Sequence, residues 1–357
     1  MSRFRRFPSF LSPRPSFRSA PRWCRVAGLG LGLALLTACG ELPAESTGST
    51  AASAPSASSA DASPAASPRG SSEPLVLMSW NVEFLWDGEA PEDGDADFPW
   101  KGDRQAARAR MADLAERIRS VDPDILGLVE VESLKALETF NRGFLGDAGY
   151  TAHLVEGQDS ATGQDVGLLS RVPITSMDRD PRRGRSGNTR KSVSKNYVAK
   201  LDIGDRKAAI IGLHFLARPE RQNRVDPRQA QADAVRGMAE EMAGQGRSVV
   251  IWGDFNDYDG AVPDHDGSRP LTRVVEMIRA MDPQDPADDL VNVAERLNRD
   301  ERYSVTFGRR DNRRKTLIDH VLLSPELAAG ITKVEIPHDR AWRDASDHYP
   351  IIVHLTP

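Results

Sequence analysis

Short apolar runs alternate with amphipathic stretches along the chain from residue 75 onward. Short runs rich in Val, Ile and Leu are typical of buried strands, and longer amphipathic stretches are typical of helices. The expected strands are Leu75–Ser79, Ile125–Val129, Val166–Ser170, Tyr197–Asp202, Ala208–His214, Val249–Trp252, Leu317–Leu323, Ile331–Ile336 and Tyr349–Leu355. The expected helices are Arg104–Arg119, Leu134–Phe144, Arg228–Met242 and Thr272–Ala280. Strands interleaved with helices predict a layered α/β domain.

Chemically capable residues follow several of these apolar runs. Asn81, Glu130, His214 and Asp254 each come at or just after the end of an expected strand. Ligands of α/β sheets bind outside the strand ends, where loops converge. The general polarity of loops accounts for any one of these residues but poorly for the whole set. The pattern therefore predicts one shared site.

The first residues of the chain have a different texture. Residues 1–38 contain seven arginines and no acid, and the apolar run Val26–Leu36 follows the last arginine. This arrangement is typical of a secretory signal, and the run is shorter than the ~20 apolar residues that span a membrane. The run leads into Leu36-Thr37-Ala38-Cys39-Gly40, which resembles the lipobox of bacterial lipoproteins, in which the cysteine is lipidated. The alternative is an ordinary signal peptide with an incidental cysteine.

The chain is thus expected to contain three segments. Residues 1–39 form a lipoprotein signal region ending at Cys39, and residues 40–73 form a disordered Ser/Ala/Pro-rich linker. Such a linker cannot bury enough surface to offset its ordering entropy. Residues 74–357 form the globular domain. The expected location is the cell envelope outside the cytoplasm, with a lipid anchor in an outer membrane or at the cell surface.

Composition and charge limit the classes of function. The chain is 39% hydrophobic and 28% charged, as in soluble globular proteins. Its formal charge is −5, and −12 without the first 38 residues, which argues against a general nucleic-acid coat. An enzyme that cuts nucleic acid remains compatible, because a cation site needs acids. The two cysteines, Cys24 and Cys39, both lie in the leader, so no disulfide is expected in the globular part.

Asp254 follows the apolar run Val249–Trp252 and Gly253, and Asn256 and Asp257 come within three residues of it. We expect these carboxylate and amide oxygens to share one small volume, where they suit hard cations such as Mg²⁺, Mn²⁺ or Ca²⁺. The alternative is a turn in which the side chains cap the strand.

Two further Asp-His pairs occur near the C-terminus. Asp347-His348 precedes the last expected strand, where the carboxylate can bind metal and the imidazole can move protons. Asp319 lies inside an apolar run, where a carboxylate needs a partner, and it is a natural orienter of His348. A salt bridge between Asp319 and an arginine is the alternative.

The remaining candidates fit a phosphate site. His214 ends a strand and is followed by Arg218, and a histidine beside basic side chains suits a phosphate, although a simple hydrogen-bonded histidine is equally compatible. Glu130 is the expected second metal carboxylate, with the Asn81 amide nearby. Glu83 and Glu132 are alternatives.

Two runs of basic residues, 178–200 and 309–315, are candidates for contacting the phosphates of a substrate. The alternative is that each run is only a solvated surface.

The motifs SWNVEFL, DILGLVEVES, DVGLLSRVPI, IIGLHF, VVIWGDFND, LIDHVLLS and SDHYPI occur in this order. Together they resemble the endonuclease/exonuclease/phosphatase superfamily, with its deoxyribonuclease I-like fold, over residues 74–357. Each motif alone is weak, but GDFN and SDH together with the others in order are specific.

The resemblance implies an α/β four-layer sandwich of two mixed β-sheets packed face to face with helices outside. It implies Mg²⁺, or alternatively Mn²⁺ or Ca²⁺, held chiefly by Glu130 with Asn81 and Asp347 close by. It places Asp254 and Asn256 at the reacting phosphate, with Arg218 as a further substrate contact suggested by its position.

For the proton transfers we expect His348, oriented by Asp319, to be the general base or at least to position the water, with Asp254 as the alternative base. His214 matches the deoxyribonuclease-type histidine and is expected to be the general acid. Glu132 departs from the pattern, because many nucleases of the superfamily place a basic residue there.

The sequence therefore predicts a lipid-anchored, metal-dependent phosphodiesterase that acts on a phosphate ester, in the first place nucleic acid. It is expected to be a monomer without a protein partner. The alternatives are a phospholipase C-like or phosphomonoesterase activity, or a lipoprotein that uses the fold only for binding.

The lipobox leads to a test of the anchor. A Cys39→Ser variant should be released from the membrane fraction and should lose labelling by radioactive palmitate, because the thiol that accepts the lipid is gone. Cys24→Ser is the matched control, since it removes the other leader cysteine. Identical membrane partition and labelling of Cys39→Ser and wild type would show that Cys39 carries no lipid.

Overall fold

The computed structural model describes residues 74–89, 97–159, 161–282, 284–308 and 313–356. Every described residue belongs to one compact unit, which lies within Ala62–Pro357. The predictions for the signal region, Cys39 and the linker up to residue 73 therefore lie outside the described residues. Within the described ranges, no helix combines the length and the apolarity needed to cross a membrane.

Two mixed six-stranded β-sheets form the centre of this unit. In each sheet one central pair is parallel, β1 with β2 and β9 with β10, and the other neighbouring strands are antiparallel. The first sheet has the order β15 (Ile331–Glu335), β16 (Ile351–Leu355), β1 (Leu75–Leu85), β2 (Ile125–Val131), β4 (Asp165–Ser170) and β3 (Thr151–Leu154). The second has the order β11 (Val291–Asn292), β14 (Asp319–Leu323), β10 (Ser248–Asp254), β9 (Arg206–His214), β8 (Lys195–Ile203) and β5 (Ile174–Asp178).

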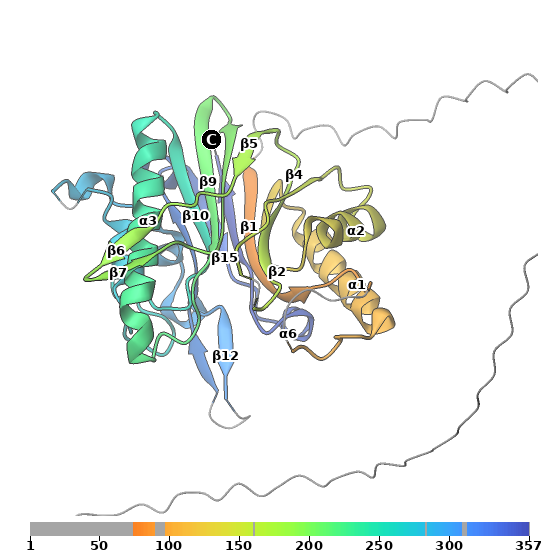
Figure 1. Ribbon diagram of the computed structural model, residues 1–357. Helices are drawn as coiled ribbons and strands as arrows, with labels where there is room; N and C mark the ends of the chain where they lie inside the picture. The colour runs from red at the N-terminus through yellow and green to blue at the C-terminus, as the bar shows by residue number, and fades with distance from the viewer. Residues whose placement is uncertain (1–73, 90–96, 160, 283, 309–312, 357) are drawn as a thin grey trace, which may run out of the picture. The chain divides into compact units, whose positions relative to one another are not determined.

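Helices cover the outer faces of the two sheets (Figure 1). α1 (Arg104–Val121) and α2 (Leu134–Phe144) lie on the first sheet, and α3 (Val225–Gly244) and α4 (Val274–Arg279) pack on the second. The predicted four-layer α/β sandwich is confirmed. The shorter elements are α5 (Pro325–Ala328), α6 (Arg340–Ala345), η1 (Gln222–Arg224), η2 (Pro286–Asp288), η3 (Val293–Arg296), η4 (Arg299–Glu301) and the hairpins β6 (Gly184–Ser186)–β7 (Thr189–Lys191) and β12 (Val305–Phe307)–β13 (Arg314–Thr316).

Local sequence signals explain the first helix. Asp103 caps the N-terminus of α1, because its carboxylate accepts a hydrogen bond from the backbone N–H of Ala106 at 3.0 Å. The buried positions include Met111, Leu114 and Ile118, whose spacing of three and four residues places them on one face. That face packs in the same core as β1 and β2.

Strand boundaries depart from the prediction at the ends that carry polar residues. β1 continues from Ser79 to Leu85, and its pairing with β2 shifts between Asn81 and Leu85. β14 begins at Asp319 rather than at Leu317. The strands β3 and β5 and the two hairpins were not predicted, because they lack a long apolar run.

The two sheets meet where a tryptophan of one lies against a glycine of the other. Trp252 of β10 donates its indole N–H to the Tyr197 hydroxyl at 2.9 Å, within the second sheet. A Cβ atom on Gly127 of β2 would lie 2.6 Å from the Trp252 ring, closer than real Cβ contacts allow. Glycine at position 127 therefore sets how closely the first sheet approaches the second.

This contact leads to a stability prediction. Gly127→Ala should lower the free energy of unfolding by about 1–3 kcal/mol, because the new methyl group overpacks against a buried ring. Gly143→Ala in α2 is the matched control, since a Cβ there meets nothing within 4 Å, and it should be neutral or slightly stabilising. Urea denaturation measures both, and equal stability of Gly127→Ala and wild type would contradict the close sheet contact.

Candidate active site

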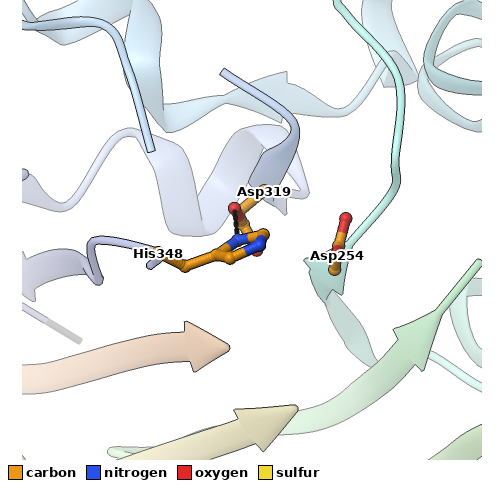
Figure 2. Close-up of side chains that lie close together, drawn as sticks. All are labelled: Asp254, Asp319 and His348. Carbon is orange, nitrogen blue, oxygen red and sulfur yellow. Dashed lines mark hydrogen bonds and ion pairs between the residues drawn. The ribbon is translucent and has the colours of Figure 1, made fainter. Parts of the chain in front are cut away.

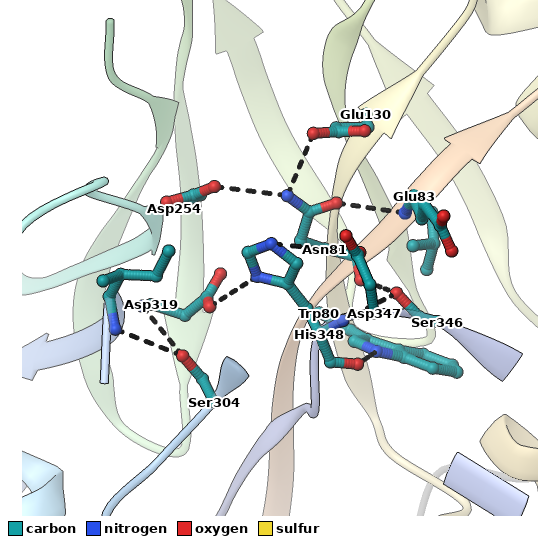
Figure 3. Close-up of polar contacts among 12 residues, drawn as sticks. Trp80, Asn81, Glu83, Glu130, Asp254, Ser304, Asp319, Ser346, Asp347 and His348 are labelled. Carbon is teal, nitrogen blue, oxygen red and sulfur yellow. Dashed lines mark hydrogen bonds and ion pairs between the residues drawn. The ribbon is translucent and has the colours of Figure 1, made fainter. Parts of the chain in front are cut away.

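The carboxyl ends of the parallel strand pairs meet at one edge of the two sheets (Figure 3). Asn81 of β1 lies beside Glu130 of β2, and His214 of β9 pairs directly with Asp254 of β10. The Asn81 amide nitrogen lies 3.2 Å from Glu130 Oε1 and 3.3 Å from Asp254 Oδ2. One amide therefore bridges carboxylates from both sheets, and the strand-end residues singled out in the sequence lie together.

His348 and Asp319 form a buried hydrogen-bonded pair. His348 Nδ1 lies 2.7 Å from Asp319 Oδ2, as the sequence predicted for an orienting carboxylate. Trp80 donates its indole N–H to the His348 carbonyl at 2.9 Å, which fixes the backbone that carries the imidazole. Burial by itself lowers the pKa of His348, but the negative charges of Asp319, Asp254 and Asp347 outweigh burial and raise it well above the ordinary value.

Asp254 faces this pair (Figure 2). Burial, reinforced by the charge of Asp319, raises the pKa of Asp254 to about 7. Its Oδ1 accepts a hydrogen bond from the backbone N–H of Asn256 at 2.7 Å, and its Oδ2 lies 3.6 Å from His214 Nε2. A carboxyl group that titrates near neutrality beside a protonated imidazole is suited to proton transfer.

Three carboxylates, those of Glu83, Glu130 and Asp347, lie on the first sheet's side of the site (Figure 3). Burial and the charges of Asp347 and Glu130 raise the pKa of Glu83. Burial also raises the pKa of Glu130, whose Oε2 accepts a hydrogen bond from Gln164 at 2.8 Å. Asp347 is 61% exposed, so its carboxylate is open to solvent. Such a set of oxygens is the kind that Mg²⁺ and Mn²⁺ prefer.

Two residues considered as metal ligands, Asn81 and Glu132, form hydrogen bonds to backbone N–H groups in the structure. The Asn81 amide oxygen accepts the backbone N–H of Glu83 at 3.0 Å, so the amide nitrogen points to the carboxylates. In this geometry Asn81 orients the carboxylates, and its role as a metal ligand stays a prediction. Glu132, an alternative to Glu130, accepts the backbone N–H of Asp87 at 3.3 Å and is buried.

Among the described residues, one group of three has atoms spaced closely enough for a cation. Atoms of Asp254, Asp319 and His348 that could act as ligands lie within 4.8 Å of one another. Asp319 and His348 of this group already bond each other through a ring nitrogen.

His214 lies beside Asp254 and is buried. Its pKa is lowered well below the ordinary value by burial and by the positive charges of Lys195 and His348. Its Nδ1 has no hydrogen-bond partner among the described residues. His214 is therefore neutral at pH 7 in this state and has a ring nitrogen to offer to a ligand.

Lys195 is a site residue that the sequence did not single out. It pairs with His214 across β8 and β9, its side chain is 8% exposed, and its Nζ lies 3.1 Å from Asp159 Oδ2. It belongs to the basic run 178–200, but other members of that run serve elsewhere: Arg182 pairs with Asp180 and Glu241. A lysine within a strand gives no sequence signal that separates it from a solvated charge.

Asp257 does not belong to the cation-binding volume in which the sequence placed it. Its carboxylate accepts the backbone N–H groups of Leu271 and Thr272 at 2.9 Å and lies near the fully buried Arg228. Arg228 also donates to the Phe255 carbonyl at 2.8 Å. Asp257 therefore shapes the loop behind Asp254, which is the structural alternative of the sequence analysis.

Strained backbone gathers at the site. Six described non-glycine residues have positive φ, and all but Asp122, which ends α1, are predicted site residues or their neighbours. Such strain of ~1–3 kcal/mol per residue persists where the surroundings fix it, and it often marks function. The five are Glu83, Phe84, Glu130, Arg218 and Asn256.

Of the basic run 309–315, residues 309–312 lie outside the described residues.

Comparison with known proteins supports the fold and the family. No curated protein matches the chain in sequence. A 3′ phosphatase from Neisseria, solved with a product DNA hairpin, has 16% identity and a TM-score of 0.52 over 79% of this chain and 99% of its own. A mannosyl-6-phosphatase from Bacteroides thetaiotaomicron has 18% identity and a TM-score of 0.51 over 79% and 99%. TDP2 from Caenorhabditis elegans has 16% identity and a TM-score of 0.51 over 79% and 74%.

At these identities the structural similarity establishes the fold. The family assignment comes from the sequence, because the pattern of the Endonuclease/Exonuclease/phosphatase family matches residues 78–348, which is most of the chain. That family acts on phosphate esters and generally uses divalent metals. The chain belongs to the endonuclease/exonuclease/phosphatase family and is a phosphoric ester hydrolase.

Proposed function

We propose that the protein is a lipid-anchored phosphodiesterase of the cell envelope that cleaves nucleic acid with Mg²⁺ or Mn²⁺. The observation that carries the chemistry is the His348–Asp319 pair opposite Asp254, next to the carboxylates that suit a cation. The anchor and the location rest on the Cys39 lipobox alone. We propose that the chain acts as a monomer.

The donor set supports the metal. Glu130 and Glu83 have raised pKa values because each is partly or fully buried beside other negative charges. A divalent cation would relieve this repulsion, and Glu130 and Asp347 would hold it, with Glu83 as an additional ligand. When bound, the metal would neutralise charge that develops on the phosphate.

We assign the role of general base to Asp254, which was the alternative in the sequence analysis. His348 is the predicted base, but its raised pKa keeps the imidazole protonated near pH 7, and a protonated imidazole cannot accept a proton. The pKa of Asp254, about 7, leaves a substantial fraction of the carboxylate able to accept a proton from water. We assign to the His348 imidazolium a hydrogen bond to the phosphate through Nε2.

We assign to His214 the protonation of the leaving oxygen. It is neutral before substrate binds, and a bound phosphate would add negative charge beside it and favour its protonated form. Lys195 and Arg218 are proposed phosphate contacts, and Asn256 holds the loop, because its amide donates to the Phe215 carbonyl at 3.3 Å.

Nucleic acid is the substrate we favour among the phosphate esters. Arg218 and Arg221 lie in the segment after His214 and form no ion pair in the part of the chain that the structure describes. One fold neighbour was solved with a product DNA hairpin, which supports a nucleic-acid substrate. A small phosphomonoester is the competing substrate, and another neighbour is a sugar phosphatase. The purified full-length protein should therefore be compared on DNA, RNA, bis-p-nitrophenyl phosphate, p-nitrophenyl phosphate and phospholipids.

The first prediction concerns the metal. EDTA should abolish activity, and Glu130→Gln should raise the Mg²⁺ concentration for half-maximal activity about tenfold or more, because a ligand charge is lost. Excess Mg²⁺ or Mn²⁺ should partly restore the variant. Glu138→Gln, at an exposed position on α2, is the matched control and should keep the wild-type requirement. Full activity in excess EDTA would refute metal dependence.

The second prediction concerns the leaving group. His214→Ala should reduce cleavage of DNA ~10²–10⁴-fold, and should reduce hydrolysis of bis-p-nitrophenyl phosphate far less, because p-nitrophenolate leaves without a proton. Asp254→Ala and His348→Ala should lose most activity on both substrates.

The control for the leaving-group experiment is His354→Ala, which removes a partly exposed histidine that pairs with Glu335. It should leave both rates unchanged. Equal losses of His214→Ala on the two substrates would show that His214 binds phosphate or supports the fold without acting as the acid.

A further inference from the structure

Arg110 on α1 is a largely buried arginine that the proposed chemistry does not use. Its side chain is 12% exposed, and its guanidinium carbon lies 3.8 Å from the centre of the Trp100 ring. One terminal nitrogen donates to the Val82 carbonyl at 2.6 Å and lies 3.3 Å from Glu83 Oε2. Arg110 thus contacts β1 directly after Asn81, where the strand departs from regular pairing.

This part of β1 holds the loop that carries Asp347 and His348. Trp80 donates to the His348 carbonyl, and Ser346 donates its hydroxyl to the Asn81 carbonyl at 2.8 Å. The carboxylate of Glu83 accepts a hydrogen bond from the Asp347 backbone (Figure 3 shows the two residues side by side). Three successive contacts therefore tie the loop to β1, and Arg110 contacts the residue that makes the last of them.

The backbone of β1 at Glu83 and Phe84 has an unfavourable conformation that needs support from its surroundings. Glu83 and Phe84 have φ values of 51° and 69°, in a region that non-glycine residues avoid. Two such residues in succession need surroundings that fix them. The guanidinium supplies two of the fixing contacts, because it bonds both the carbonyl that precedes Glu83 and the Glu83 side chain.

We propose that Arg110 is a positioning residue that fixes Glu83, and through Glu83 the Asp347 backbone, for binding of the divalent cation. The inference rests on the proposed metal-dependent function and adds a residue that does not itself touch metal or substrate. Outer partners that orient metal-ligating carboxylates typically change metal affinity about 10–100-fold when removed. Lysine is a poor substitute, because its ammonium group lacks the planar guanidinium face that stacks on Trp100.

The direction in which Mn²⁺ affinity changes when Arg110 is replaced distinguishes a positioning role from a purely electrostatic one. A buried cation close to a metal site opposes the binding of another cation, so its removal should tighten metal binding if only charge matters. Positioning predicts the reverse, because removal frees Glu83 and the loop. Arg110→Met should therefore weaken Mn²⁺ binding about tenfold, and Arg110→Lys should recover only part of this loss.

The experiment measures Mn²⁺ binding to the purified full-length protein by calorimetry without substrate, together with the shift in melting temperature on adding Mn²⁺. Arg110→Met, Arg110→Lys and Glu83→Gln are compared singly, and Arg110→Met is combined with Glu83→Gln. Arg104→Met on the same helix is the matched control, because its side chain is 63% exposed, and it should bind Mn²⁺ like wild type.

A positioning role requires the two substitutions to be non-additive: once Glu83 is neutral, Arg110→Met should add less than about a twofold further loss of affinity. Unchanged or tighter Mn²⁺ binding in Arg110→Met, or full additivity with Glu83→Gln, would overturn the inference. A variant that only destabilises the fold would melt earlier but keep the wild-type shift on adding Mn²⁺. Glu130→Gln tests the site itself, and normal Mn²⁺ binding in that variant would refute the proposed metal site instead.

Discussion

The site is arranged around one constraint, the repulsion among carboxylates that lie near one another with little access to water. Burial and neighbouring negative charges raise the pKa values of Glu83, Glu130 and Asp254. Negative groups of this kind are tolerated only where cations and N–H donors offset their charge. Here the offset comes from the His348 imidazolium, from the amide of Asn81 and, on the outer side, from Arg110. The same imbalance makes the site a good host for a divalent cation.

The strained backbone is a consequence of that arrangement. Regular strands alternate their side chains between two faces, so neighbouring strands cannot aim several carboxylates at one point without a local irregularity. Glu130 has a φ of 68° where the pairing of β2 with β4 shifts by one residue, and a bulge of this kind re-aims a side chain. Glu83 lies in the corresponding irregularity of β1. The two bulges bring carboxylates from parallel neighbours to the same side of the site.

The sequence predicts the residues that follow apolar runs well and those inside other elements poorly. Asn81, Glu130, His214 and Asp254 could be identified because each ends a run that must be a strand, and the two-sheet fold followed from the resemblance of the motifs. Lys195 and Arg110 could not, because a cation within a strand or helix looks like any solvated charge until tertiary packing buries it. The prediction for Asp257 was wrong for the opposite reason, because the spacing of this residue along the chain suits a cation site. Loop geometry, which spacing does not encode, decides that its carboxylate instead faces the backbone of Leu271 and Thr272.

The site is divided between the two sheets, which makes its chemistry depend on packing some distance away. Glu130 and Asn81 belong to the first sheet, whereas Asp254 and His214 belong to the second, and the amide of Asn81 bonds across the gap at 3.3 Å. The separation of the sheets is set in the core, where the Trp252 ring lies against Gly127, three residues before Glu130 on β2. A hydrogen bond of this length is near the limit of what counts as one, so a shift of the sheets by less than an ångström would break the contact between Asn81 and Asp254. The absence of a side chain at position 127 therefore affects the contact between the two halves of the candidate site as well as the packing of the core.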